Sequence, residues 1–78
     1  MLAVLWSGPC RFFFYSNENR EPPHIHAERD EKVAKYWLEP VALASNHGFR
    51  SRELTDIRDM VVEHREKFLE AWNGHFGG

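Results

Sequence analysis

The hydrophobic pattern divides the chain into an extended N-terminal part and a helical C-terminal part. Up to residue 50, short apolar runs rich in aromatic and β-branched residues alternate with turn residues, a pattern typical of strands. The predicted strands are Leu2–Trp6, Cys10–Ser16, His24–Arg29, Lys32–Leu38 and Val41–Ser45. The turn sequences "SGP" and "RDEK" predict two hairpins, so the pattern indicates an antiparallel sheet of four or five strands.

After residue 50 the apolar positions repeat at helical spacing. Ser51 is a suitable N-cap residue, with Glu53 in the first turn, and Asn73 and Gly74 form a stop signal. The apolar stripe between them consists of Leu54, Ile57, Val61, Phe68 and Trp72. This spacing predicts one long amphipathic helix, or two helices with a kink within residues 62–64. The expected fold class is therefore α+β, an antiparallel sheet of four or five strands packed by a long C-terminal amphipathic helix.

Both faces of the predicted sheet carry large apolar side chains. Successive residues of a strand point to opposite faces, so Phe13 and Tyr15 oppose Phe12 and Phe14, and Trp37 opposes its neighbours in the same way. One helix covers only one face of so small a sheet. We therefore expect Phe13, Tyr15 and Trp37 to bind a second copy of the chain, giving a homodimer, or a partner protein. The alternative is a strongly curled sheet that covers itself.

Composition and charge narrow the class of protein. A length of 78 residues allows one domain, residues 1–76, followed by a flexible tail of residues 77–78, and the 42% apolar and 14% aromatic content predicts a folded chain. The single Cys10 cannot form an internal disulfide, and no signal peptide or membrane span is recognisable, which together favour a cytoplasmic protein. No motif for a cofactor is present, and none is expected. The net charge of −2 argues mildly against general attraction to nucleic acid.

The stretch "EPPHIHAE" places two histidines one residue apart, directly after two prolines. On a strand, His24 and His26 project from the same face, with backbones roughly 6.5 to 7 Å apart, while Ile25 points to the other face. Pro22 and Pro23 restrict the entrance of this strand and hold the histidines at a set angle.

This histidine pair has three possible uses. The first is a metal site, which needs a third ligand such as Glu18 or His47 from another segment. The second is metal-independent RNA cleavage, with His24 and His26 as general acid and base and with Arg11, Arg20 or Tyr15 stabilising charge. The third is a structural or interfacial role, in which the imidazoles donate hydrogen bonds to neighbours or to a partner. The candidate catalytic residues are thus His24, His26, Arg11 and Tyr15, and no metal is assigned.

The motifs "FFFYSNE", "PPHIHA", "AKYWLEPVALA" and "EAWNGHF" extend over most of residues 11–76. In these motifs the chain resembles a family of short prokaryotic proteins, the domain of unknown function 4160. The loop after Glu18 has Asn19 where a histidine is expected from the family. The resemblance implies a partner-bound protein, because members are often encoded beside a small protein of the domain of unknown function 2442 type, in an arrangement similar to a toxin and antitoxin pair.

Three functional hypotheses follow from the sequence. The leading one is a protein-interaction module, one component of a toxin-antitoxin-like pair, whose uncovered sheet face binds itself or a small neighbour-encoded protein. The second is a ribonuclease that uses the histidine pair. The third is a DNA-binding autoregulator, which requires a basic surface gathered from Arg11, Lys32, Lys35, Arg50 and Arg52. Five carboxylates on the polar side of the predicted helix disfavour nucleic acid there.

Overall fold

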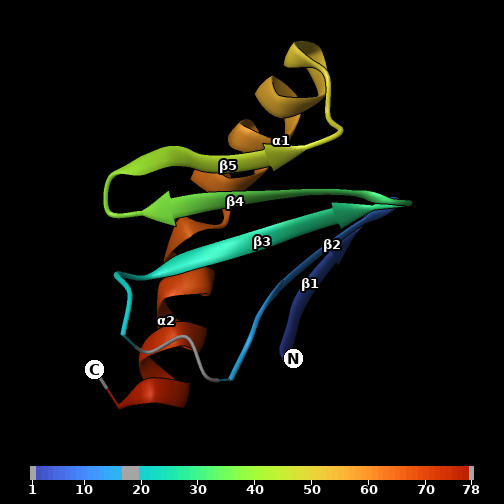
Figure 1. Ribbon diagram of the computed structural model, residues 1–78. Coiled ribbons are helices and arrows are strands. Elements are labelled where there is room, and N and C mark those ends of the chain that lie inside the picture. Colours follow the sequence, from blue (N-terminus) through green and yellow to red (C-terminus); the bar gives the residue numbers. More distant parts are fainter. Residues whose placement is uncertain (1, 17–19, 78) are drawn as a thin grey trace.

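The computed structural model describes residues 2–16 and 20–77, in which five strands form one antiparallel sheet and two helices lie on one side of it (Figure 1). The strands neighbour one another in chain order, β1-β2-β3-β4-β5, so every connection is a simple turn or loop. The elements are β1 (Leu2–Ser7), β2 (Cys10–Phe14), β3 (His24–Arg29), β4 (Lys32–Leu38), β5 (Val41–His47), α1 (Ser51–Glu63) and α2 (Arg65–Phe76). The predicted α+β class is confirmed, with all five strands present.

Two of the hairpins turn through residues with positive φ. Gly8 (φ 57°) follows β1 and Asp30 (φ 55°) follows β3, each at the start of a two-residue connection. Two-residue hairpins favour positive φ because it matches the twist of the paired strands, and Gly and Asp adopt it more readily than other residues. The predicted turns therefore lie where the sequence placed them.

The core lies between the sheet and the helices. The alternate residues that face the helices are buried, and Phe12 stacks on Phe68 of α2 with ring centroids 5.4 Å apart. Tyr36 is also buried, and its hydroxyl donates a hydrogen bond of 2.9 Å to the carbonyl of Leu54 in α1. This bond satisfies the one polar group of an otherwise apolar side chain and ties β4 to α1.

The predicted long helix is broken at His64, whose φ of −103° and ψ of 15° separate α1 from α2. The side chain of Arg65 follows the break and donates a hydrogen bond of 2.6 Å from Nε to the carbonyl of Leu38. The break lies in the region where the sequence allowed a kink. In Figure 1, α1 begins above β5 and runs down behind it, and α2 continues across the back of the sheet.

Both predicted helix ends need correction. The N-cap is Arg50 rather than Ser51, and the Arg50 backbone N–H donates a 3.0 Å hydrogen bond to the side chain of Glu53. The helix also continues past Asn73 and Gly74 to Phe76, because Phe76 packs on Trp72 with ring centroids 4.4 Å apart. Burial of this aromatic ring outweighs the weak helix propensity of Asn and Gly.

The described part of the predicted tail, residues 77–78, is Gly77. The N–H of Gly77 donates a 2.8 Å hydrogen bond to the carbonyl of Asn73, and Gly77 has a left-handed conformation, which ends the helix. Gly78 lies outside the described residues.

Candidate functional site

The candidate site is the sheet face that points away from the helices. Strand register places its side chains in one layer: Trp6 lies opposite Arg11, Phe13 opposite His26, and His24 opposite Trp37. We call this surface the aromatic face and define it as Trp6, Arg11, Phe13, Tyr15, His26, Lys35 and Trp37. His24 shares this register at the start of β3, but its ring packs against Trp72 of α2. Because side chains alternate along a strand, the sequence predicted the common orientation of most of these residues.

Phe13 is 1% exposed although no helix covers it. Its ring stacks on that of His26 at 5.3 Å and meets the edge of Tyr15 at 5.4 Å, while the Arg11 guanidinium lies 4.6 Å from its centroid. Long side chains of the sheet itself therefore cover the centre of this face. Of the three predicted partner-binding residues, Phe13 is buried, Trp37 is half-buried, and Tyr15 is exposed.

Trp6 is the most exposed large hydrophobic residue of this face, with 66% of its surface accessible. It lies on β1, in register with Arg11, whose guanidinium is 6.0 Å from its ring. Trp6 was predicted to lie on a strand but was not among the predicted site residues. The available signal was its place beside a turn at the end of a short strand, where a large side chain has few neighbours.

Both cations of the aromatic face are paired with carboxylates. Arg11 donates to Glu28 on the adjacent strand at 2.5 Å, and Lys35 forms an ion pair with Glu21. The Lys35 ammonium also lies 4.6 Å from the ring centroid of Trp37. These pairs fix the cations over aromatic rings and cancel their charge, so the face carries little net positive potential.

The two predicted histidines do lie together, with ring centroids 5.2 Å apart and perpendicular planes. Their surroundings differ. His24 is fully buried, with its ring 4.7 Å from that of Trp72 in α2 and 5.7 Å from that of Trp37. His26 is half-buried and packs between Phe13 and Tyr15 on the aromatic face.

The two prolines hold this arrangement through their carbonyl groups. The Nδ1 atom of His24 lies 3.0 Å from the Pro22 oxygen, and since a carbonyl only accepts, Nδ1 is the protonated nitrogen. The Pro23 oxygen accepts a 3.0 Å hydrogen bond from the N–H of Leu38. The proline pair thus anchors both the ring of His24 and the entrance of β3.

This geometry limits what the histidines can do chemically. General acid and base catalysis needs each imidazole within hydrogen-bond reach of the substrate, and the ring of His24 is closed off from solvent. For metal binding, no three His, Cys, Asp or Glu side chains come together among residues 2–16 and 20–77. The suggested ligand Glu18 lies outside these ranges, and His47 lies on β5, with β4 between it and the histidine strand.

The five cations of the DNA-binding hypothesis do not gather on one surface. Arg11 and Lys35 lie on the aromatic face, whereas Lys32 pairs with Glu53 of α1 at 3.0 Å. Arg50 and Arg52 are exposed at the start of α1.

Cys10 lies in the core beside a small cavity of about 60 Å³. Burial raises the pKa of its thiol; the charge of Arg29 opposes this shift, and Glu53 adds a smaller raising effect. A thiol of this kind is not an activated nucleophile.

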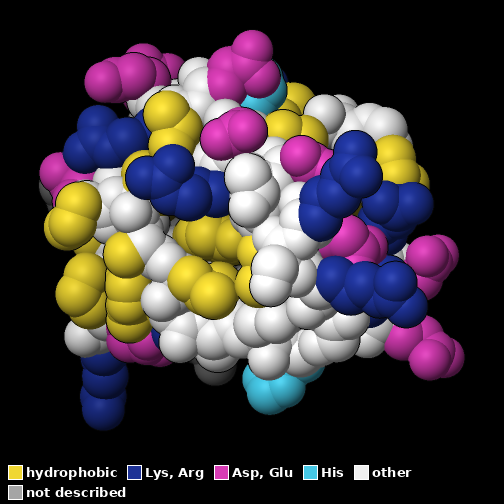
Figure 2. Space-filling model, turned by 90° about the horizontal axis from the view of Figure 1, so that it is seen from above, with side chains coloured by type: hydrophobic (Ala, Val, Ile, Leu, Met, Phe, Trp, Pro, Cys, Tyr) yellow, Lys and Arg dark blue, Asp and Glu magenta, His cyan; other side chains and the backbone are white. Residues whose placement is uncertain are grey.

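Apolar side chains also gather on a second surface, the end formed by β5 and α1 (Figure 2). The exposed large apolar residues of these two elements are Leu43 of β5, 45% exposed, and Val62 of α1, 49% exposed. Lys and Arg side chains adjoin this area in the same view. Neither of these two apolar residues is aromatic, unlike the exposed Trp6 and Tyr15 of the aromatic face.

Fold and site together define a small α+β domain, a five-stranded meander backed by two helices on one side and covered by its own aromatic and basic side chains on the other. The chain belongs to the family described as Domain of unknown function (DUF4160), whose model matches residues 10–73. Comparisons with curated proteins and with solved structures gave no match. Neither helix of the described chain has the length and apolar character needed to span a bilayer.

Proposed function

We propose that this protein is a protein-interaction module that binds a small partner protein through its aromatic face, as one component of a toxin-antitoxin-like pair. One observation carries the proposal: Trp6, which lies opposite Arg11, and Tyr15, which packs against Phe13 on the same face, are 66% and 44% exposed. Trp, Tyr and Arg are the residue types that dominate binding energy at protein interfaces. The partner we favour is a small neighbour-encoded protein, as the family resemblance implies.

The rigidity of the face supports this function. Arg11 is held by Glu28 and by the ring of Phe13, and Tyr15 contacts both Phe13 and His26. Side chains that are already fixed lose little conformational entropy when a partner binds, so more of the contact energy appears as affinity. A buried centre with an exposed aromatic rim is therefore suited to recognition.

Titration calorimetry with the purified neighbour-encoded protein tests the proposal. Tyr15→Ala and Trp6→Ala should each cost about 2 kcal/mol, or about 30-fold in Kd, if these residues are central to the interface. Leu43→Ala is the matched control, because Leu43 is 45% exposed, close to the 44% of Tyr15, but belongs to the other surface. No binding by the unaltered chain, or equal losses in all three variants, would reject this role for the aromatic face.

The other two hypotheses receive less support. RNA cleavage by a histidine pair requires both imidazoles at the phosphodiester, but His24 is 0% exposed and Arg11 is neutralised by Glu28. DNA binding requires unpaired cations on one surface, whereas Lys32 and Lys35 each have a carboxylate partner.

A further inference from the structure

The strand β1 is an edge of the sheet without charged residues or prolines. It pairs with β2 and with no other strand of the described chain, and its six residues, LAVLWS, include no charge and no proline. Charged residues and prolines are the usual means by which natural edge strands avoid pairing with another chain. The other edge, β5, ends in Ser45, Asn46 and His47, and the Asn46 side chain is bonded to the backbone of Phe49.

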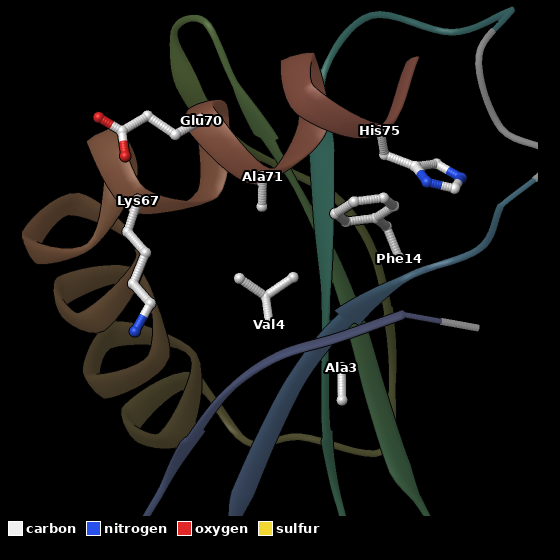
Figure 3. A pocket seen from close by; sticks show the side chains of 7 residues that line it. All are labelled: Ala3, Val4, Phe14, Lys67, Glu70, Ala71 and His75. Atoms are coloured by element: carbon white, nitrogen blue, oxygen red, sulfur yellow. The ribbon is translucent and has the colours of Figure 1, made fainter. Parts of the chain in front are cut away.

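An open groove of about 580 Å³ lies beside β1, between this strand and α2 (Figure 3). Its lining combines Ala3, Val4, Phe14 and Ala71 with Lys67, Glu70 and His75. The strand register shifts between Ala3 and Leu5, and in Figure 3 the side chain of Val4 points toward Ala71 across the groove. The helices therefore leave apolar surface open at the β1 edge of the sheet.

The outer wall of the groove carries one charge of each sign. Lys67 and Glu70 lie three residues apart on α2, both are exposed, and neither makes an ion pair within the described chain. In a contact related by a two-fold axis, residue i of one copy meets residue j of the other and the reverse. A surface with one positive and one negative group is complementary to itself under that symmetry.

We infer that the β1 edge and its groove bind a second copy of this chain, forming a homodimer in which two β1 strands pair antiparallel. The two-fold axis beside β1 places both α2 helices on the same side of the joined sheet, with the two grooves facing each other. Lys67 of one copy then pairs with Glu70 of the second copy, and Glu70 with Lys67. A second copy is the occupant because its edge is equally apolar and because its Lys67 and Glu70 are complementary to the Glu70 and Lys67 of the first copy. A domain of this size also gains stability from association.

Charge reversal tests this arrangement by analytical ultracentrifugation. Lys67→Glu alone puts two carboxylates on the outer wall of each groove, and Glu70→Lys alone puts two ammonium groups there. Each single variant should therefore raise the dissociation constant of the dimer by about tenfold or more. The double variant Lys67→Glu/Glu70→Lys keeps the self-complementary pattern. Its dimer dissociation constant should lie within about threefold of that of the unaltered chain. Mixing the two single variants should give heterodimers, because every contact across the axis again joins opposite charges.

Two controls separate this inference from other interfaces and from the proposed function. Tyr15→Ala should leave the dimer intact, so loss of partner binding and loss of dimer are measured independently. Leu43→Lys, on the β5 edge, should also leave it intact, and dissociation by this variant alone would assign the dimer to β5. Hydrogen exchange should show β1 amides more protected in the dimer than after dilution to monomer.

The inference is overturned by a monomer at concentrations up to about 100 µM. It is also overturned by a dimer that neither reversal weakens, or by single variants that remain monomeric when they are mixed.

Discussion

The burial of His24 makes its removal the sharpest test of the site geometry. The ring is 0% exposed, lies 4.7 Å from the ring of Trp72, and is bonded through Nδ1 to the carbonyl of Pro22. If these contacts hold β3 against α2, His24 is primarily a structural residue. Truncation to alanine should then destabilise the fold, whereas truncation of an exposed catalytic histidine would leave stability nearly unchanged.

The magnitude follows from two contributions. Removing a buried aromatic side chain typically costs 3 to 5 kcal/mol, and the imidazole ring is at the small end of that class, so we expect about 3 kcal/mol from the lost packing. Loss of the hydrogen bond adds about 1 kcal/mol. His24→Ala should therefore lower the free energy of unfolding by about 4 kcal/mol, a large share of the roughly 4 to 12 kcal/mol expected for a chain of this length. His24→Phe fills the site with another aromatic ring and loses only the hydrogen bond, so it should lower the free energy of unfolding by only about 1 kcal/mol.

Urea unfolding followed by tryptophan fluorescence measures these values, since Trp37 and Trp72 both contact the ring of His24. His47→Ala, an exposed histidine on β5, is the control and should change stability by less than about 0.5 kcal/mol. A His24→Ala variant as stable as the control would refute the reasoning. The burial of this ring would then have no energetic consequence, and a chemical role for the histidine pair would regain support.

Three further predictions concern groups whose environment is well defined. Tyr36→Phe removes the hydroxyl that donates to Leu54 and should lower the urea unfolding free energy by about 1 kcal/mol. The pKa of Glu53 lies below its ordinary value because its carboxylate accepts from the Arg50 backbone and from Lys32. This carboxylate therefore stabilises the fold above its unfolded pKa, and the contribution should disappear as pH falls through the folded pKa. The thermal unfolding midpoint of Glu53→Gln should thus lie below that of the unaltered chain at pH 7, and the two midpoints should converge at acid pH. A difference in midpoint that does not depend on pH would contradict this. Cys10 is buried with a raised pKa, so an aromatic disulfide reagent should label it at least about 100-fold more slowly in the native state than in urea, and equal rates would mean the thiol is accessible.

Much of this fold follows from periodicity alone. Alternation of apolar residues along each strand predicted which face Phe12 and Phe13 take, and the same period of two predicted that His24 and His26 share a face. Helical spacing predicted the buried positions Ile57 and Phe68. These features are local, because they depend on the spacing of apolar residues within one strand or helix and not on the segments that pack against it.

The rest depends on contacts between segments distant in sequence. Phe13 is buried because register brings His26 beside it and Arg11 folds over its ring. His24 is buried because Trp72, almost fifty residues further on, reaches the same point from α2. No periodic spacing in the sequence predicts contacts between residues this far apart in the chain. The two apolar faces were therefore predictable, and a sheet that covers itself was the stated alternative, but the polar and aromatic side chains that cover the second face were not predicted.

The two proposed surfaces lie on opposite faces of the sheet but share β1. The exposed ring of Trp6 belongs to the aromatic face, while Val4 of the same strand faces the groove. Pairing of two β1 strands would therefore place the two aromatic faces next to each other on one continuous sheet, around a single two-fold axis. Each copy would still present its own Tyr15 and Arg11, so the partner should bind at two sites per dimer. Light scattering of the complex should then give the mass of one dimer with two partner molecules. A mass with one partner molecule per dimer would mean that the partner contacts both Trp6 residues across the two-fold axis.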